Sequence, residues 1–190
     1  MSINTPDKFL YKTTITNTLR NDIISKLKKF KLPRYLEIGS DIGLTYFSLN
    51  SFYHECFAVD IDDNRHGKSI EIQRDFEKRG IKFNPINRIY GDVLSVENNN
   101  YDVVLIDGDH SYAGAKLDFE TILSKNESEN FFVFFHDYGL VNAGVKKFVD
   151  EIIESNLFSF EYAGEEKDWN PLGSSPTNDW ESVCFHIEKK

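Results

Sequence analysis

The sequence is poor in cysteine. Its 190 residues contain only Cys56 and Cys184, and each lies inside an apolar run that is typical of a buried strand. Two isolated cysteines exclude a disulfide framework and a zinc site built from cysteines. We therefore expect both thiols to be reduced and buried.

Positive charge is also scarce. Lys and Arg number 22 against 31 Asp and Glu, which gives a formal net charge of -9. Nucleic-acid binding depends on cationic side chains that neutralise phosphates, so this balance argues for no nucleic-acid partner. The densest basic stretch is interpreted as the solvated face of an N-terminal helix, and it consists of Lys26, Lys28, Lys29, Lys31 and Arg34.

Long hydrophobic runs are absent. No apolar stretch reaches the roughly 20 residues of a membrane span, and the first residues lack the apolar region of a signal peptide. We expect a cytoplasmic protein with no membrane partner.

The chain does have enough apolar residues for one core. Its hydrophobic content is 40%, with sixteen Phe, and 190 residues is the length of one ordinary domain. We expect a single domain over 1–190, with an N-terminal helical segment at 1–33 and the core at 34–190. The oligomeric state stays open, a homo-oligomer included.

Strand and helix signals alternate along the core. They follow a first helix in which Leu19, Ile23, Leu27 and Phe30 recur at helical spacing, with Thr16 or Asn17 as its cap. This order indicates βαβ units around a parallel sheet, closed by an antiparallel strand pair. The expected strands are 35–38, 55–59, 86–90, 103–106, 131–135, 158–162 and 183–187, and the expected later helices are 68–79, 112–124 and 145–153.

Ligands of such sheets bind beyond the carboxyl ends of the strands, so the loops there are informative. The stretch YLEIGSDIG (35–43) has Glu37 at the end of a strand and Gly39 and Gly43 in the following turn. These glycines would let the backbone approach a ligand, and Glu37 would repel a pyrophosphate. The spacing differs from the dinucleotide pattern G-x-G-x-x-G. A purely structural turn is the alternative.

Acidic residues also follow the next two strands. Asp60 stands 21 residues after Gly39, where a carboxylate in this class of fold accepts both hydroxyls of a ribose. The neighbouring Asp62 and Asp63 are interpreted as solvated turn residues. Asp92, preceded by Gly91, is by itself part of an ordinary turn.

The densest ionisable group follows the strand at 103–106. Asp107, Asp109 and His110 stand there within four residues, while His136 and Asp137 follow the strand at 131–135. Asp107 and Asp137 would lie at neighbouring strand ends, close enough to share a divalent cation. Such a group indicates a functional site, and a hydrogen-bonded set that only fixes the loops is the alternative.

Taken together, these stretches resemble the Methyltransf_24 type of class I methyltransferases, relatives of the macrocin and mycinamicin sugar O-methyltransferases. The resemblance rests on DGDHSY (107–112) and on the His136–Asp137 pair followed by GVKKFVDEI (144–152), and it covers about 35–155. It implies a Rossmann-like α/β fold with helices on both faces of a seven-stranded, mostly parallel sheet. The implied strand order is 3-2-1-4-5-7-6, with the last strand antiparallel.

The resemblance also implies S-adenosylmethionine as the cofactor. Glu37 would lie at its methionine end, Asp60 at its ribose and Asp92 near the adenine amino group. The residues expected to contact the cofactor are Glu37, Gly39, Ser40, Gly43, Asp60, Ile61, Asp92, Val93 and Asp107.

In the metal-dependent sugar methyltransferases of this group, a D-x-x-H stretch supplies a metal ligand and a general base. Asp107 and His110 match these positions, so the expected catalytic residues are His110, Asp107 and Asp137. The relatives have two acidic residues where this chain has His136 and Asp137, and His is a softer ligand than Mg²⁺ prefers. The expected ligands of a divalent cation are Asp107, His136 and Asp137.

The resulting hypothesis is methyl transfer to a hydroxyl of a small, sugar-like molecule. A nucleic-acid methyltransferase and a cofactor-binding domain without transfer activity are the alternatives. The acceptor is expected to enter beneath the N-terminal helix and the loop 165–180. There Trp169 and Trp180 would either stack on a ring or anchor the loop on the core.

Overall fold

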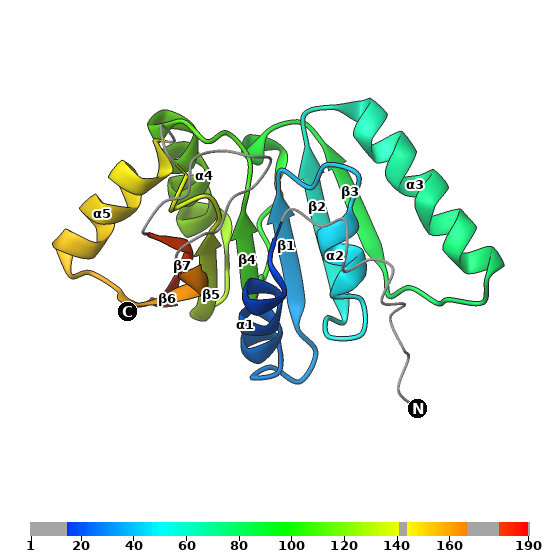
Figure 1. The fold of residues 1–190 in the computed structure, drawn as a ribbon, viewed down its shortest axis with the longest axis horizontal. Helices are drawn as coiled ribbons and strands as arrows, with labels where there is room; N and C mark the ends of the chain where they lie inside the picture. Colours follow the sequence, from blue (N-terminus) through cyan, green and yellow to red (C-terminus); the bar gives the residue numbers. More distant parts are fainter. Residues whose placement is uncertain (1–14, 141–143, 167–178, 190) are drawn as a thin grey trace.

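The computed structural model describes residues 15–140, 144–166 and 179–189, which form a seven-stranded sheet with helices on both faces (Figure 1). The strands are β1 Arg34–Ile38, β2 Glu55–Asp60, β3 Ile86–Tyr90, β4 Val103–Ile106, β5 Asn130–Phe135, β6 Ser159–Glu166 and β7 Trp180–Glu188. Their order is β3-β2-β1-β4-β5-β7-β6, and β7 runs antiparallel to both of its neighbours. The predicted fold class and strand order are confirmed.

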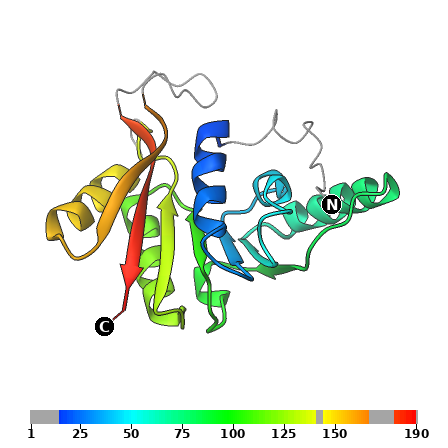
Figure 2. The same cartoon turned by 90° about the horizontal axis from the view of Figure 1, so that it is seen from below.

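The helices divide between the two faces of the sheet (Figure 2). Side chains of the first three helices pack in one apolar cluster, and those of the last two pack in the other. The helices are α1 Asn17–Leu27, α2 Leu44–Ser48, α3 Asp63–Lys78, α4 Tyr112–Lys125 and α5 Val145–Ser155, with a short 3-10 helix, η2, at Val93–Ser95.

Helices cover both faces of the parallel strands, so the side chains on both faces must be apolar. This explains the uninterrupted apolar runs in β4 and β5. Side chains alternate across the sheet: Leu36 and Ile38 of β1 join the cluster under α4 and α5, while Tyr35 joins the cluster under α1.

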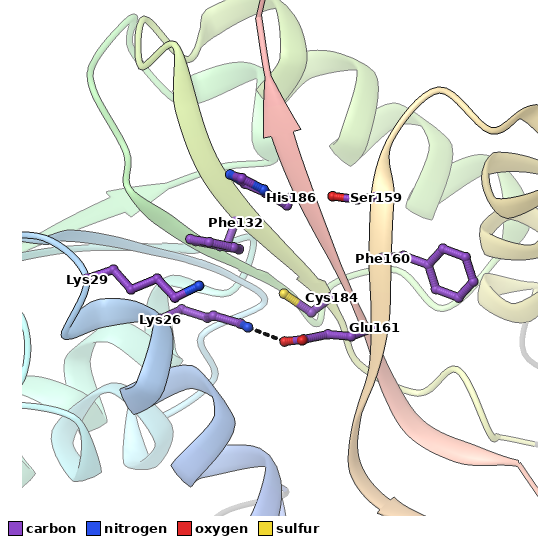
Figure 3. Close-up of a pocket in the computed structure, with 8 residues that line it drawn as sticks. All are labelled: Lys26, Lys29, Phe132, Ser159, Phe160, Glu161, Cys184 and His186. Atoms are coloured by element: carbon purple, nitrogen blue, oxygen red, sulfur yellow. Dashed lines mark ion pairs between the residues drawn. The ribbon is translucent and has the colours of Figure 1, made fainter.

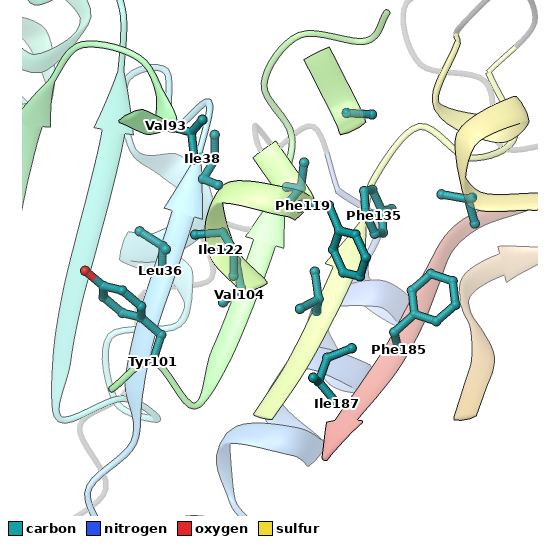
Figure 4. Packing of buried hydrophobic residues seen from close by; sticks show 14 of the residues in the cluster. Leu36, Ile38, Val93, Tyr101, Val104, Phe119, Ile122, Phe135, Phe185 and Ile187 are labelled. Carbon is teal, nitrogen blue, oxygen red and sulfur yellow. The ribbon is translucent and has the colours of Figure 1, made fainter. Parts of the chain in front are cut away.

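Aromatic contacts fix α4 on the sheet (Figure 4). The Phe119 ring of α4 lies 5.4 Å from the Phe135 ring of β5, and Phe135 lies edge-on to Phe185 of β7 at 5.9 Å. Such pairs contribute about 0.5–1.5 kcal/mol beyond their buried area. These contacts hold α4 against β5 and β7.

The clearest differences from the predicted boundaries are in α3, β6 and β7. Helix α3 begins at Asp63 and not at residue 68, because the Asp62 carboxylate accepts a hydrogen bond from the Asn64 backbone N–H at 2.9 Å and caps the helix. Asp62 is thus a capping residue and not only a solvated turn residue. Strand β6 continues to Glu166 and β7 begins at Trp180, so both ends of the expected loop 165–180 are strand.

The interpretation of the basic stretch as one solvated helix face is wrong. Helix α1 ends at Leu27, so the later lysines follow it, and Arg34 lies in β1 paired with Glu55 at 3.0 Å. Lys26 is buried and forms an ion pair with Glu161 of β6. Its aliphatic stem covers apolar surface while its charge is neutralised.

Both cysteines are free and buried, as expected. Among the described residues, no helix has the length and apolar character needed to span a membrane.

Thr16 joins α1 to the sheet. Its hydroxyl oxygen accepts a hydrogen bond from Leu19 N at 3.1 Å, and the hydroxyl donates to the buried carboxylate of Glu181. We expect Thr16→Ala to lower the free energy of unfolding by about 1–2 kcal/mol, measured by urea denaturation. Thr18→Ala, which removes an exposed hydrogen bond to Glu165 from the same helix, is the matched control. Equal losses in both variants would contradict this role.

Candidate functional site

A cavity of about 820 Å³ opens at the carboxyl edge of the sheet, between the loops that follow β1, β2, β3 and β4. Its charge favours a cationic ligand and disfavours phosphate groups. The charged and titratable residues of the lining are seven aspartates, one arginine and one histidine: Asp41, Asp60, Asp62, Asp92, Asp107, Asp109, Asp118, Arg65 and His110.

The loop after β1 touches the loop after β4 through its backbone. Gly39 has a φ of +81°, and a Cβ atom there would lie 2.0 Å from the carbonyl oxygen of Asp107. Only glycine fits this approach, so a larger residue would displace the Asp107 loop. Gly39 lines the cavity, whereas Ser40 and Gly43 do not.

Glu37 lies behind this loop and does not line the cavity. It is 3% exposed and accepts a hydrogen bond from the Tyr35 hydroxyl at 2.8 Å. Burial raises the pKa of the Glu37 carboxyl well above its ordinary value, against the opposing effect of the Tyr35 hydrogen bond. An effect of Glu37 on a ligand would therefore act through the backbone of the loop.

Asp60 ends β2 at the wall of the cavity, as predicted. Its Oδ2 accepts a hydrogen bond from Asp41 N at 2.7 Å, and its Oδ1 accepts one from Asp62 N at 2.8 Å. Each carboxylate oxygen can accept a second hydrogen bond, so both remain usable by a ligand. The next residue, Ile61, is 73% exposed and also lines the cavity.

Asp92 caps the 3-10 helix η2 by accepting a hydrogen bond from Leu94 N at 3.0 Å. Both Asp92 and the buried Val93 line the cavity. The acidic turn after β3 therefore borders the cavity.

The predicted ionisable group does come together at the ends of β4 and β5. Asp107 Oδ1 lies 2.8 Å from His136 Nδ1, and Asp137 Oδ1 lies 3.2 Å from the same nitrogen. Asp137 Oδ2 lies 2.9 Å from His110 Nε2. Asp137 adopts a φ of +60°, a conformation that non-glycine residues rarely take.

The pKa shifts follow from these contacts. The hydrogen bond to Asp137 raises the pKa of His110, against the effect of partial burial. Burial raises the pKa of Asp137, but hydrogen bonds from His110 and His136 outweigh it, so the net shift is downward. Burial lowers the pKa of His136, but the hydrogen bonds and charges of its carboxylate neighbours raise it well above its ordinary value.

Sequence reasoning missed Glu181. This residue of β7 is fully buried, and its Oε1 lies 3.5 Å from His136 Nε2. It also accepts a hydrogen bond from Thr16 N at 2.8 Å. The only available signal was an acidic residue at the start of an apolar strand, which does not reveal its partner.

Of the two tryptophans near the expected acceptor entrance, Trp180 stacks on Tyr162 with ring centroids 5.7 Å apart. This contact favours the anchoring interpretation for Trp180. Trp169 lies outside the described residues.

A second cavity of about 160 Å³ lies between the end of α1 and strands β5, β6 and β7 (Figure 3). Lys26 is paired with Glu161, and Lys29 Nζ stands 4.6 Å from the centroid of the Phe132 ring. None of the site residues predicted from the sequence lines this cavity.

A family match covers the residues that line the larger cavity. The Methyltransf_24 family, described as a methyltransferase domain, matches residues 36–138, more than half of the chain. The chain belongs to this family. S-adenosylmethionine is the methyl donor that the family and the fold imply. No curated protein matches the chain.

Solved structures share the fold at low sequence identity. A Klebsiella pneumoniae protein assigned as an O-methyltransferase is 11% identical with a TM-score of 0.68, over 100% of this chain and 92% of that one. The O-methyltransferase TomG of Streptomyces achromogenes, solved in complex with S-adenosylmethionine, is 10% identical with a TM-score of 0.61. The match covers 90% of this chain and 79% of that one. An rRNA methylase of Streptococcus thermophilus is 12% identical with a TM-score of 0.57, and the match covers 90% of this chain and 94% of that one.

Proposed function

We propose that this methyltransferase acts on a hydroxyl of a small, sugar-like molecule at the edge of the 820 Å³ cavity. The observation that carries the proposal is the meeting of Asp107, His110 and Asp137 beside an acidic cavity. S-adenosylmethionine suits this lining because it has sulfonium and ammonium charges and no phosphate. NAD would bring two phosphates among seven aspartates and should not bind.

The cofactor would extend from the loop after β1 to the loop after β3. Its methionine part would lie against Gly39, its ribose hydroxyls on Asp60, and its adenine between Ile61 and Leu117, two exposed apolar residues of the lining. The full set proposed to bind the cofactor or to shape its loops is Glu37, Gly39, Ser40, Gly43, Asp60, Ile61, Asp92, Val93 and Asp107.

His110 is the proposed general base. Its Nε2 lies 2.9 Å from Asp137, which favours the tautomer with a proton on Nε2 and leaves Nδ1 to accept the proton of the acceptor hydroxyl. The side chain is 46% exposed, so an acceptor can reach it. The bound cofactor supplies a methyl group on a sulfonium centre. Asp137 stabilises the imidazolium that His110 becomes as the hydroxyl oxygen attacks in line.

Asp107, His136 and Asp137 are the proposed ligands of a divalent cation. One ligand atom of each lies within 4.8 Å of the others. His136 Nδ1 lies 2.8 Å from Asp107 Oδ1 and 3.2 Å from Asp137 Oδ1. These separations suit one shared ion, because neighbouring ligands that each lie about 2.1 Å from an octahedral ion stand roughly 3 Å apart. Nitrogen in the set favours a transition metal over Mg²⁺. When bound, the ion would lower the pKa of the acceptor hydroxyl.

A nucleic-acid acceptor is the alternative, since one structure with the same fold is an rRNA methylase. The net charge of -9 and the acidic cavity argue against it. A screen that follows a labelled methyl group onto sugars, phenols and RNA separates these acceptors. Cofactor binding without transfer to any of them would contradict the proposed activity.

His110→Ala should lower turnover roughly a hundredfold or more while folding and cofactor affinity stay unchanged, because only proton removal is lost. Labelled-methyl transfer, calorimetry with S-adenosylhomocysteine and thermal melting measure the three properties. The matched control is His54→Ala, at an exposed position. A lower melting temperature with unchanged turnover per folded molecule would show that His110 is structural.

Asp60→Ala should weaken S-adenosylhomocysteine binding by about 1.5–3 kcal/mol, because the ribose hydroxyls lose a charged acceptor. Asp62→Ala, which removes the cap of α3, should lower the melting temperature and leave affinity nearly unchanged. Calorimetry on both variants checks this. A larger loss of affinity in Asp62→Ala than in Asp60→Ala would contradict the assignment of the ribose to Asp60.

Removal of the cation should stop the reaction. We expect dialysis against EDTA to lower turnover, and Mn²⁺ to restore it better than Mg²⁺ because one ligand is an imidazole. Ca²⁺, which prefers oxygen ligands, serves as the control ion. Full turnover after EDTA would remove the cation from the proposal and leave His110 as base.

A further inference from the structure

Glu181 of β7 is a fully buried carboxylate that the proposed mechanism does not use. Its Oε1 accepts a hydrogen bond from Thr16 N at 2.8 Å. Its Oε2 accepts one from Glu165 N at 3.2 Å and another from the Thr16 hydroxyl. Gly164 leaves room for it, since a Cβ added there would lie 2.3 Å from Oε2. The backbone before α1 and the backbone of β6 therefore fix this carboxylate in place.

Its ion-pair partner among the described residues is His136, whose Nε2 lies 3.5 Å from Glu181 Oε1. The other ring nitrogen, Nδ1, lies 2.8 Å from Asp107 Oδ1 and 3.2 Å from Asp137 Oδ1. The two nitrogens of one buried ring thus meet different carboxylates. Glu181 contacts the nitrogen that the proposed cation site does not use.

A histidine that ligates a metal through one nitrogen usually donates the N–H of its other nitrogen to a carboxylate or carbonyl. That hydrogen bond fixes the tautomer and the orientation of the ring. Glu181 stands in this position behind His136. A half-turn of the ring would place carbon atoms where both nitrogens now lie, so a hydrogen bond at Nε2 also holds Nδ1 towards Asp107.

We propose that Glu181 is a positioning residue of the cation site. It accepts a hydrogen bond from Nε2–H of His136 and so presents Nδ1 to a divalent cation shared with Asp107 and Asp137. The inference rests on the proposed function, whose cation ligands it uses, and deepens it. Because the imidazole distinguishes this ligand set from one made only of oxygen, Glu181 also supports the preference for a transition metal over Mg²⁺.

The first test measures Mn²⁺ binding to the full chain by electron paramagnetic resonance of the free ion, and Mg²⁺ binding by competition. Glu181→Gln should raise the Kd for Mn²⁺ about 10–100-fold. Its amide has a single acceptor oxygen, which cannot serve both His136 and the backbone donors. The Kd for Mg²⁺ should rise less, since Mg²⁺ gains less from an imidazole ligand, whereas a folding defect weakens both ions alike.

A second variant separates positioning from folding. In His136→Asn the side-chain oxygen can take the place of Nδ1, but the side chain is too short to reach Glu181. Adding Glu181→Gln to this variant should change the Kd for Mn²⁺ less than about twofold, because no ring remains to be oriented. The matched control is Glu161→Gln, which removes the carboxylate paired with Lys26 and should leave Mn²⁺ binding unchanged.

A measurement on the wild type needs no variant. The ¹⁵N chemical shifts of the His136 ring in the Zn²⁺-loaded protein should show the metal on Nδ1 and a proton on Nε2. Metal on Nε2 would overturn the inference.

The other outcomes are equally distinct. Equal losses of Mn²⁺ affinity with and without His136 would show that Glu181 only stabilises the fold. Unchanged affinity in Glu181→Gln would overturn the inference and leave the cation site in place. If the wild type bound no Mn²⁺, the cation would leave the proposed function together with this inference, while labelled-methyl transfer tests the rest of that function separately.

Discussion

The buried imidazole of His136 is the group on which the arrangement of the site depends. It is 2% exposed at the end of β5, and carboxylates reach it from three other places: Asp107 after β4, Asp137 beside it and Glu181 in β7. Removing one partner from a buried ionic group of this kind costs about 3–5 kcal/mol. Through Glu181 the same network reaches Thr16 before α1, so it connects the N-terminal helix and the last strand to the loops after β4 and β5.

Burial assigns different roles to carboxyl groups of the same site. Asp137 is buried but receives hydrogen bonds from two histidines, so its pKa falls and it stays ionised as the partner of His110. Among the described residues, neither Glu37 nor Asp118 accepts a hydrogen bond from a cationic side chain, and burial raises the pKa of each. Carboxyl groups of one chemical type thereby differ in charge according to their hydrogen-bond partners and burial.

The backbone at the carboxyl edge is constrained as tightly as the side chains. Gly39 packs against the Asp107 carbonyl, while Asp41 and Asp137 hold positive φ angles of 45° and 60° without being glycines. Such conformations persist only where the surroundings enforce them, and here they border the cavity and the histidine cluster. The loops therefore present their N–H groups and carboxylates in a preset geometry, which is what a site needs if positioning supplies much of the rate.

The sequence by itself determined the strands and the edge at which the site lies. Short apolar runs that end in Asp60, Asp107 or His136 are typical of buried parallel strands, and parallel strands bring their carboxyl ends to one edge. What it could not determine is which distant side chains meet. Glu181 beside His136, Lys26 paired with Glu161, and Asp118 at the cavity were decided by how helices and the antiparallel strand pack on the sheet. Periodicity specifies the face on which a residue lies, but a contact between segments as far apart as Thr16 and Glu181 depends on the three-dimensional packing of every element between them.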